Sequence, residues 1–152
     1  MDTGACRGLQ GPGLHVRQPG RTMPYPRFFC PCALSMPLLD TALIRDWHAH
    51  VYFDAESRDT AWALRETIAQ ELAGRVELGR FHERPVGPHP VWSYQLAFGT
   101  DDFSHVIGWL ALNHGTLDVF AHPNTGNGLR DHRDCAIWLG HSHTLNLAGF
   151  TG

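Results

Sequence analysis

The stretch Trp47-His48-Ala49-His50-Val51-Tyr52-Phe53 decides how the rest of the chain is interpreted. Its aromatic and β-branched residues predict a short β-strand. Because alternate side chains of a strand share a face, one face carries His48, His50 and Tyr52. The other face is apolar and is expected to point into the core, with Trp47, Ala49, Val51 and Phe53. Two imidazoles on one strand face indicate a metal site, although the same pattern also occurs on solvated strands.

Length and composition bound the possible functions. A chain of 152 residues fits one domain of ordinary size, and no apolar run is long enough to cross a bilayer. The net charge of −3 argues against nucleic-acid binding, which usually needs a basic surface. Ten of the 11 histidines lie between His48 and His143. Histidine is the commonest metal ligand and the usual proton carrier near neutral pH, so the excess points to the function.

The first 44 residues differ in composition from the rest. Six of the ten prolines fall there, and no periodicity is sustained. We expect residues 1–44 to be a disordered extension or sequence upstream of the true start, and residues 45–152 to form the domain. The four cysteines, Cys6, Cys30, Cys32 and Cys135, match neither a zinc ribbon nor a secreted disulfide framework. A reducing, cytoplasmic location is therefore expected.

The pattern of the domain predicts an α+β fold. After the first strand we expect a helix over about 57–74, strands over 76–83 and 91–98, a helix over 101–115, a strand over 117–122 and a short helix over 131–139. The order βαββαβ is the ferredoxin-like split βαβ arrangement, a four-stranded antiparallel sheet with two helices on one face. The opposite face, with His48 and His50, would be bare. A homodimer is therefore predicted, since monomers seldom expose large apolar patches.

Two further histidines have positions that suit a metal ligand. His122 ends the fourth strand, which neighbours the first strand in this fold, so His122 could approach His48 and His50. Pro123 is expected to end the strand pairing there. His89 lies between Pro88 and Pro90 in a stiff turn, so a ligand or an acid–base residue would be held there at little cost in entropy. A half-buried histidine bonded to a loop carbonyl is the alternative for His122.

The remaining histidines are weaker candidates. His82 could belong to an ordinary polar strand end, and His132 follows Asp131, which could cap a helix rather than orient the imidazole. The pair His141 and His143 is expected to be solvated. No nucleophile elbow, Walker loop, dinucleotide fingerprint or zinc-protease motif is present.

Four motifs in order carry a resemblance to a known family: WHAHVYFD, HERPVGPHP, HPNTG and DHRDCAIWLG, within about residues 46–148. The chain resembles the DOPA 4,5-dioxygenase family of small enzymes that open aromatic rings. The resemblance implies extradiol cleavage of a catechol such as DOPA, with O₂ and a non-haem iron. The family's histidines match His48, His50, His82, His89, His122 and His132.

The resemblance also implies roles for these residues. An Fe(II) site with a few protein ligands and open positions is the general design of non-haem oxygenases, and zinc could replace iron in purified protein. We expect His50 and His122, then His48 and His89, as metal ligands. His82 or His132 would take the catechol proton, because an imidazole suits acid–base work near neutrality. The aromatic residues Tyr52, Trp92 and Tyr94 could bind the substrate ring.

Two other functions stay open from the sequence alone. A non-catalytic metal-binding ferredoxin-like module, such as a sensor or carrier, would need the same histidines. A ferredoxin-like dimerisation domain would have histidines that merely populate a polar cleft. Metal analysis would separate the last function from the others.

Overall fold

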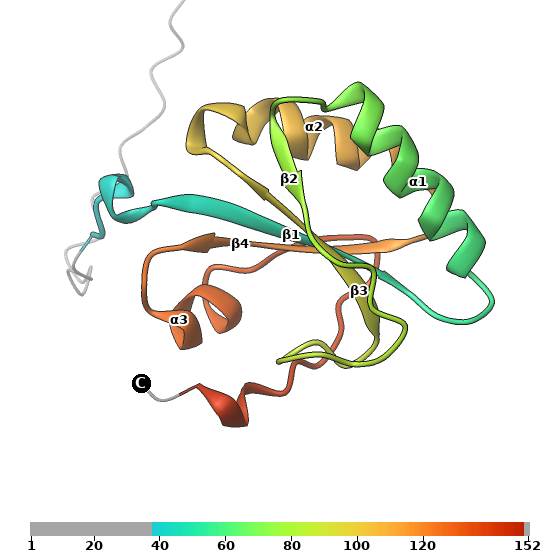
Figure 1. Cartoon of the computed structure of the whole chain (residues 1–152). Coiled ribbons are helices and arrows are strands. Elements are labelled where there is room, and N and C mark those ends of the chain that lie inside the picture. The colour runs from blue at the N-terminus through green and yellow to red at the C-terminus, as the bar shows by residue number, and fades with distance from the viewer. Residues whose placement is uncertain (1–37, 151–152) are drawn as a thin grey trace, which may run out of the picture. The chain divides into compact units, whose positions relative to one another are not determined.

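A computed structural model describes residues 38–150 of the chain (Figure 1). Residues 1–37 of the predicted extension lie outside the described residues, so most of that prediction is untested. The elements, in order, are the 3-10 helix η1 (Thr41–Leu43), β1 (Asp46–Phe53), α1 (Arg58–Glu71), β2 (Val76–Leu78), β3 (Trp92–Phe98), the 3-10 helix η2 (Thr100–Asp102), α2 (Phe103–Asn113), β4 (Asp118–Asn124), α3 (Gly128–Arg133), β5 (Ile137–Leu139) and the 3-10 helix η3 (Leu147–Gly149).

The strands form one antiparallel sheet in the order β2-β3-β1-β4-β5, with β1 in the middle. The first four strands have the predicted ferredoxin-like arrangement, so the predicted α+β fold class is confirmed. The fifth strand is an addition. It lies where the sequence predicted a short helix over 131–139, and that helix is instead α3, which ends at Arg133. β4 also continues through Pro123, which pairs with Trp47, so the expectation that Pro123 ends the pairing was wrong.

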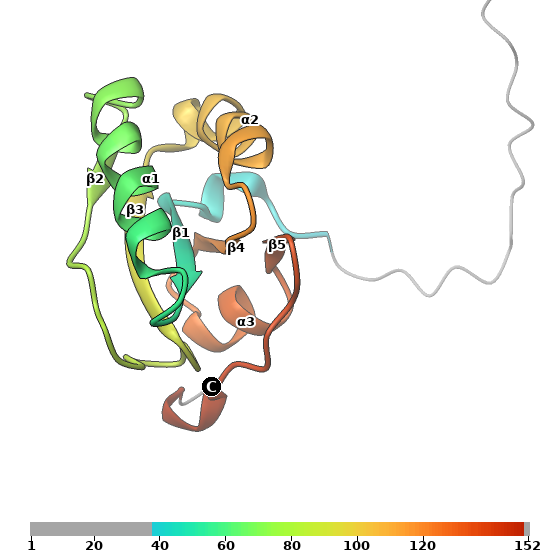
Figure 2. The ribbon, with the colours of Figure 1, turned by 90° about the vertical axis from the view of Figure 1, so that its right-hand side faces the viewer.

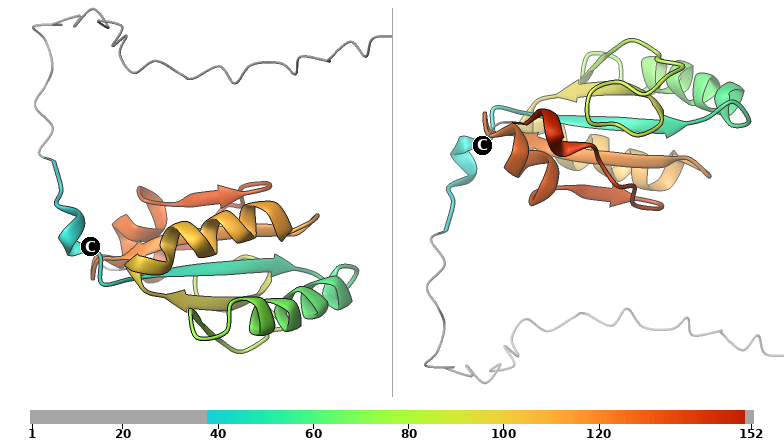
Figure 3. Two further views of the ribbon diagram at one scale, coloured as in Figure 1. Left: turned by 90° about the horizontal axis from the view of Figure 1, so that it is seen from above. Right: turned by 90° about the horizontal axis from the view of Figure 1, so that it is seen from below.

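The helices α1 and α2 cover one face of the sheet and enclose the core (Figures 2 and 3). α1 buries Ala61 and Ile68, and α2 buries Val106 and Leu110. The sheet supplies apolar side chains from alternate positions of its strands: Ala49, Val51, Phe53, Tyr94, Leu96, Phe98, Val119 and Ala121. The buried residues thus recur at about every turn along the helices and at every second residue along the strands.

The opposite face of the sheet is covered by the chain itself. The view from below shows the loop between β2 and β3, the helix α3 and the C-terminal segment over this face (Figure 3). The backbone N–H of Asn146 donates to the carbonyl oxygen of Pro88, which ties the C-terminal segment to the loop. Tyr52 and Phe120 on this face are 2% and 0% exposed. The prediction of a bare face was therefore wrong, and the homodimer stays a prediction without that support.

None of the helices within residues 38–150 combines the length and the apolar character needed to cross a bilayer.

Candidate metal centre

Three imidazoles meet on the covered face of the sheet, where β1 and β4 run side by side. His48 and His50 come from β1, and His122 comes from β4 directly opposite His48. Their ring centroids are 5.3 Å apart for His48 and His122, and 5.6 Å apart for His50 and His122. One nitrogen from each ring lies within 4.8 Å of the other two, close enough for the three to bind one metal ion.

The hydrogen bonds of these rings leave nitrogen atoms free for a ligand. The Nε2 atoms of His50 and His122 are buried and have no partner among the described residues. His122 donates from Nδ1 to the carbonyl oxygen of Pro123 at 2.9 Å, so its Nε2 carries the lone pair. A carbonyl that fixes the outer nitrogen is the usual support of a metal-bound histidine. Two buried, unpartnered acceptors cost about 1–3 kcal/mol each, and a metal ion would satisfy both.

The electrostatics favour the neutral imidazoles that metal binding needs. Burial, followed by the nearby His89, His122 and His48, lowers the pKa of His50 well below its ordinary value. Burial and then His132 lower the pKa of His122 to about 4. The rings of His50 and His122 are therefore uncharged at neutral pH, and their lone pairs are available.

One carboxylate lies beside the cluster. Asp46 precedes His48 by two residues on the same face of β1, and its Oδ1 is 3.5 Å from His48 Nε2. Because alternate residues of a strand share a face, the sequence already indicated that Asp46 lies beside His48, but Asp46 was not among the predicted site residues. Glu83, which follows His82 in the sequence, is bonded to Arg58 at 2.6 Å and faces solvent.

His89 belongs to the cluster but is not in the group of three. Its ring lies 3.9 Å from that of His50, and its Nδ1 is 2.7 Å from the hydroxyl of Tyr52. Burial raises the pKa of Tyr52 above its usual range, so the phenol keeps its proton and can donate it to His89. The proton of His89 then sits on Nε2. In this tautomer His89 is a hydrogen-bond donor rather than a metal ligand, and its predicted ligand role stays untested.

The predicted acid–base residues lie at the edge of the cluster. His132, on α3, has its ring 3.9 Å from that of His122, and its Nδ1 donates to the carbonyl oxygen of Gly128 at 2.8 Å. Its Nε2 is therefore an acceptor. Burial lowers the pKa of His132, which keeps the ring neutral. His82 pairs with Ser93 through the backbone and lines a cavity together with His50 and His89.

Two of the three predicted substrate-binding residues lie on the wrong face of the sheet. Trp92 pairs with Phe53, and Tyr94 pairs with Val51, so both point toward α1 and α2. Tyr94 is part of the core, and Trp92 packs against it. The strand from 92 to 98 has its large apolar side chains at every second position, which is the signal that these two residues were core. Tyr52 is on the histidine side, where it bonds His89.

Other polar contacts on this side were missed from the sequence. Asp118 accepts hydrogen bonds from the backbone N–H of His141 at 2.7 Å and from Nε2 of His143 at 2.8 Å. The pair His141 and His143 was expected to be solvated, and for His143 this was wrong, because it is half-buried against Tyr52. Asp131 does not cap α3. It is 2% exposed and binds the backbone N–H and hydroxyl of Thr125, so it holds the loop before α3.

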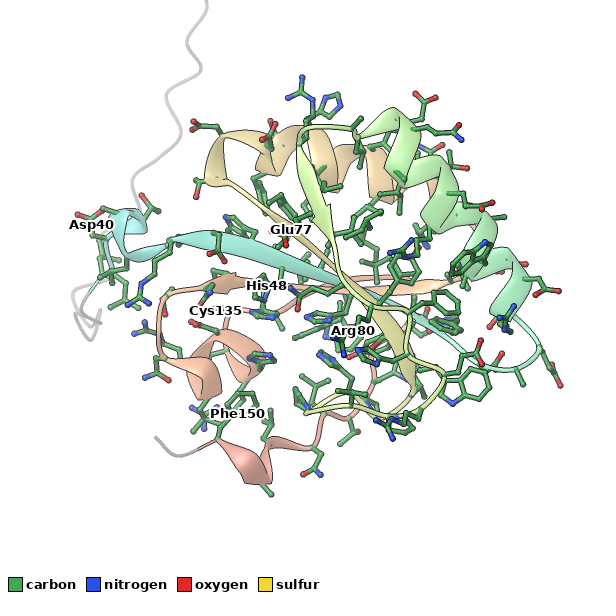
Figure 4. The ribbon with its side chains drawn as sticks, in the orientation of Figure 1. Asp40, His48, Glu77, Arg80, Cys135 and Phe150 are labelled. Carbon is green, nitrogen blue, oxygen red and sulfur yellow. The ribbon has the colours of Figure 1, made fainter. Side chains whose placement is uncertain are left out.

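A cavity of about 260 Å³ lies beside the cluster, between β1, β3 and the loop that follows β2. His50 and His89 form part of its wall, and so do Arg80 and His82. Figure 4 shows Arg80 and His48 on the ribbon. A larger cavity of about 400 Å³ lies at the other end of β1, beside Tyr52 and Asp118, and none of the three imidazoles lines it. Of these two cavities, the smaller one reaches the metal centre, at His50.

Comparison with known proteins agrees with this geometry. Residues 47–149 match the Dopa 4,5-dioxygenase family. A DOPA 4,5-dioxygenase of Amanita muscaria is 37% identical over 112 residues, which are 69% of this chain and 49% of that protein. An uncharacterised 21.2 kDa protein of Botryotinia fuckeliana is 34% identical over 121 residues, 72% of this chain and 66% of its own length. The chain thus spans about half to two thirds of these curated relatives.

A solved structure has the same fold. The crystal structure of a candidate dioxygenase from Nostoc punctiforme is 45% identical in sequence, with a TM-score of 0.68. The match covers 72% of this chain and 94% of that one.

Proposed function

This chain belongs to the Dopa 4,5-dioxygenase family, and we propose that it is a dioxygenase that opens the ring of a catechol such as DOPA by extradiol cleavage. The observation that carries the proposal is the group of three imidazoles, His48, His50 and His122, whose nitrogens lie within 4.8 Å of one another. Two of them have a buried Nε2 with no partner among the described residues. These atoms fit a metal ion.

We propose Fe(II) as that metal, held by His48, His50 and His122. Three protein ligands with open positions are typical of non-haem Fe(II) oxygenases, in which the bound iron supplies the redox chemistry between O₂ and an organic substrate. One ligand is commonly a carboxylate. Asp46 lies beside His48 but outside the group of three, which favours an all-histidine set.

The protons would be handled by histidines around this group. His132 is neutral, and its Nε2 is free to accept the proton that a catechol hydroxyl must lose. With Tyr52 donating to Nδ1, His89 carries its proton on Nε2, from which it can donate a hydrogen bond to an oxygen of the substrate or product. His82 lines the same cavity as His89 and stays a second candidate for the base.

Aromatic side chains would exclude water from the reacting groups. Phe120 is fully buried and lies against His50, His122 and His132. Phe150, from the C-terminal segment, packs on His132 at 4.6 Å. A dry site strengthens the electrostatic interactions that the imidazoles make with a bound catechol.

Anaerobic loading with Fe(II), followed by O₂ and a panel of catechols that includes DOPA, tests the proposal. A yellow ring-opened product with matching O₂ uptake is the expected result, and zinc-loaded protein is the inactive control. Tight metal binding without O₂ uptake for any catechol would favour the non-catalytic metal-binding module instead. A protein that binds neither iron nor zinc would contradict both functions.

A further inference from the structure

Arg80 is a cationic residue of the cavity beside the candidate metal centre. It lies in the loop after β2 and lines the 260 Å³ cavity that also reaches His50 and His89. Among the lining residues, all of which the structure describes, Arg80 is the one with a permanent charge, and no carboxylate is present. The volume lies just below the roughly 300–1,000 Å³ of most small-molecule sites, which suits a single substituted ring.

Within residues 38–150, most arginines have a polar partner, and Arg80 has none. Arg58 is bonded to Glu83 and Arg75 to Asp102, both at 2.6 Å, and Arg133 is bonded to Asp134 at 2.7 Å. No ion pair or hydrogen bond joins the Arg80 guanidinium to another described residue. Arg80 is exposed, so its donors are open to solvent and available to a ligand that enters the cavity. Arg84 is also unpaired, but it does not line the cavity, so it offers a matched comparison.

We infer that Arg80 binds a carboxylate on the catechol side chain, and that the preferred substrates are catechol acids without an amino group rather than DOPA itself. A guanidinium can donate two parallel hydrogen bonds to a carboxylate, which gives both affinity and orientation. The inference rests on the proposed function, because the carboxylate would direct the ring of a catechol toward His50 and the metal centre.

No carboxylate lines this cavity to pair with an ammonium group. Glu83, the acidic residue in the same loop, is already bonded to Arg58. Glu77 lies on the same face of the sheet, opposite Ala97 of β3, but it lines a different cavity near η2. The amino group of DOPA would thus lose water without gaining a carboxylate and would lie close to the positive charge of Arg80. Such a mismatch disfavours a ligand even where its other groups fit.

Four catechols distinguish the effect of the carboxylate from that of the ammonium group. 3,4-Dihydroxyphenylpropionate has the carboxylate alone, DOPA has both charges, dopamine has the ammonium alone and 4-methylcatechol has neither. We expect the highest kcat/KM for the propionate and the lowest for dopamine. Arg80→Gln should lower kcat/KM for the propionate by about tenfold to hundredfold, the usual effect of a charged hydrogen bond, and change that for 4-methylcatechol less than about threefold.

Three variants serve as comparisons. Arg84→Gln, a charge loss four residues away, should leave all four values unchanged. Arg80→Glu should reverse the order so that dopamine is used better than the propionate. Glu77→Gln should not alter the use of DOPA. If it removes a preference of the unaltered protein for DOPA, then Glu77 recognises the amino group and the inference is overturned.

Binding to the metal-free protein keeps the test independent of turnover. Calorimetric titration with 3,4-dihydroxyphenylpropionate should show binding that weakens about tenfold or more in Arg80→Gln and stays the same in Arg84→Gln. If no catechol is turned over but this difference holds, the proposed function fails while the role of Arg80 stands. Equal binding by the unaltered protein and Arg80→Gln overturns the inference even if the enzyme is active.

Discussion

The two faces of β1 share one backbone but differ in almost everything else. Ala49, Val51 and Phe53 pack under α1 and α2 in an apolar core. His48, His50 and Tyr52 lie on the other side, among imidazoles and under a covering of loops. Neighbouring residues of β1 therefore lie in different environments. The helix-covered face thus supplies the apolar core, and the other face holds the candidate metal centre at some cost in buried polar groups.

The largest effect should follow from removing a metal ligand. His50→Ala or His122→Ala should lose the metal and lower the activity by at least about a hundredfold. The loss should be larger than the roughly tenfold to hundredfold that follows when a residue that only supports a ligand is removed. Folding should survive, because each change removes a buried nitrogen that has no partner in the described protein. Metal analysis with circular dichroism measures both properties.

His105→Ala is the control for these variants, since His105 is exposed on α2. It should keep full metal content and activity. Full activity in both His50→Ala and His122→Ala would show that the ligands have been assigned to the wrong residues.

The opposite face should respond in the opposite way. Leu96 is fully buried between β3 and the helices. Leu96→Ala should lower the free energy of unfolding by about 2–5 kcal/mol through the cavity it leaves. Urea unfolding measures this loss, and the metal bound per folded molecule should not change. A variant that stays stable but loses its metal would mean that the two faces are not separable.

Acid should weaken the metal-free protein through the histidine face. Burial and neighbouring histidines lower the pKa values of His89 and His122 to about 4, from an ordinary value of 6.5. Between these pH values the unfolded chain binds protons that the folded protein does not. Stability is thus fully present above about pH 6.5 and falls as the pH drops toward 4, by up to about 3 kcal/mol for each histidine.

Urea unfolding of the metal-free protein at several pH values checks this dependence. A metal ion binds only the deprotonated rings, so metal affinity should fall over the same range. A stability that is flat from pH 7 to pH 4 would show that these rings are not held neutral by the fold.

The smallest effect separates two buried tyrosines on opposite faces. Tyr52→Phe removes the hydrogen bond to His89 and should lower kcat by about tenfold, less than the roughly hundredfold or more of a whole acid–base residue, because Tyr52 only orients His89. The metal content should stay the same. Tyr94→Phe is the matched change on the core face, where the hydroxyl has no partner among the described residues. It should leave kcat unchanged and cost little or no stability. Equal kcat values for the two variants would contradict the role given to Tyr52.

The alternation within one strand was readable from the sequence, because the period of two depends only on local geometry. It placed His48, His50 and Tyr52 on one face, and the fold order placed β4 and His122 beside them. The same rule, had it been applied to residues 92–98, would have placed Trp92 and Tyr94 in the core.

The features that the sequence did not predict depend on contacts between distant segments. β5, the part of the covering made by α3 and the C-terminal segment, and the hydrogen bonds that Asp118 accepts from His141 and His143 all arise where the chain after β4 folds back. Gly140, with φ of 84°, makes that return, and a Cβ there would collide with Asp118. Neither the position of such a turn nor what it meets follows from local periodicity.

The central position of β1 has a kinetic consequence. All three imidazoles of the candidate metal centre are on strands paired along their length, and β1 has a neighbour on each side. Inner strands open only with the whole fold, whereas loops open locally and often. A metal ion held there would leave through stepwise release of its ligands, not through backbone fluctuation.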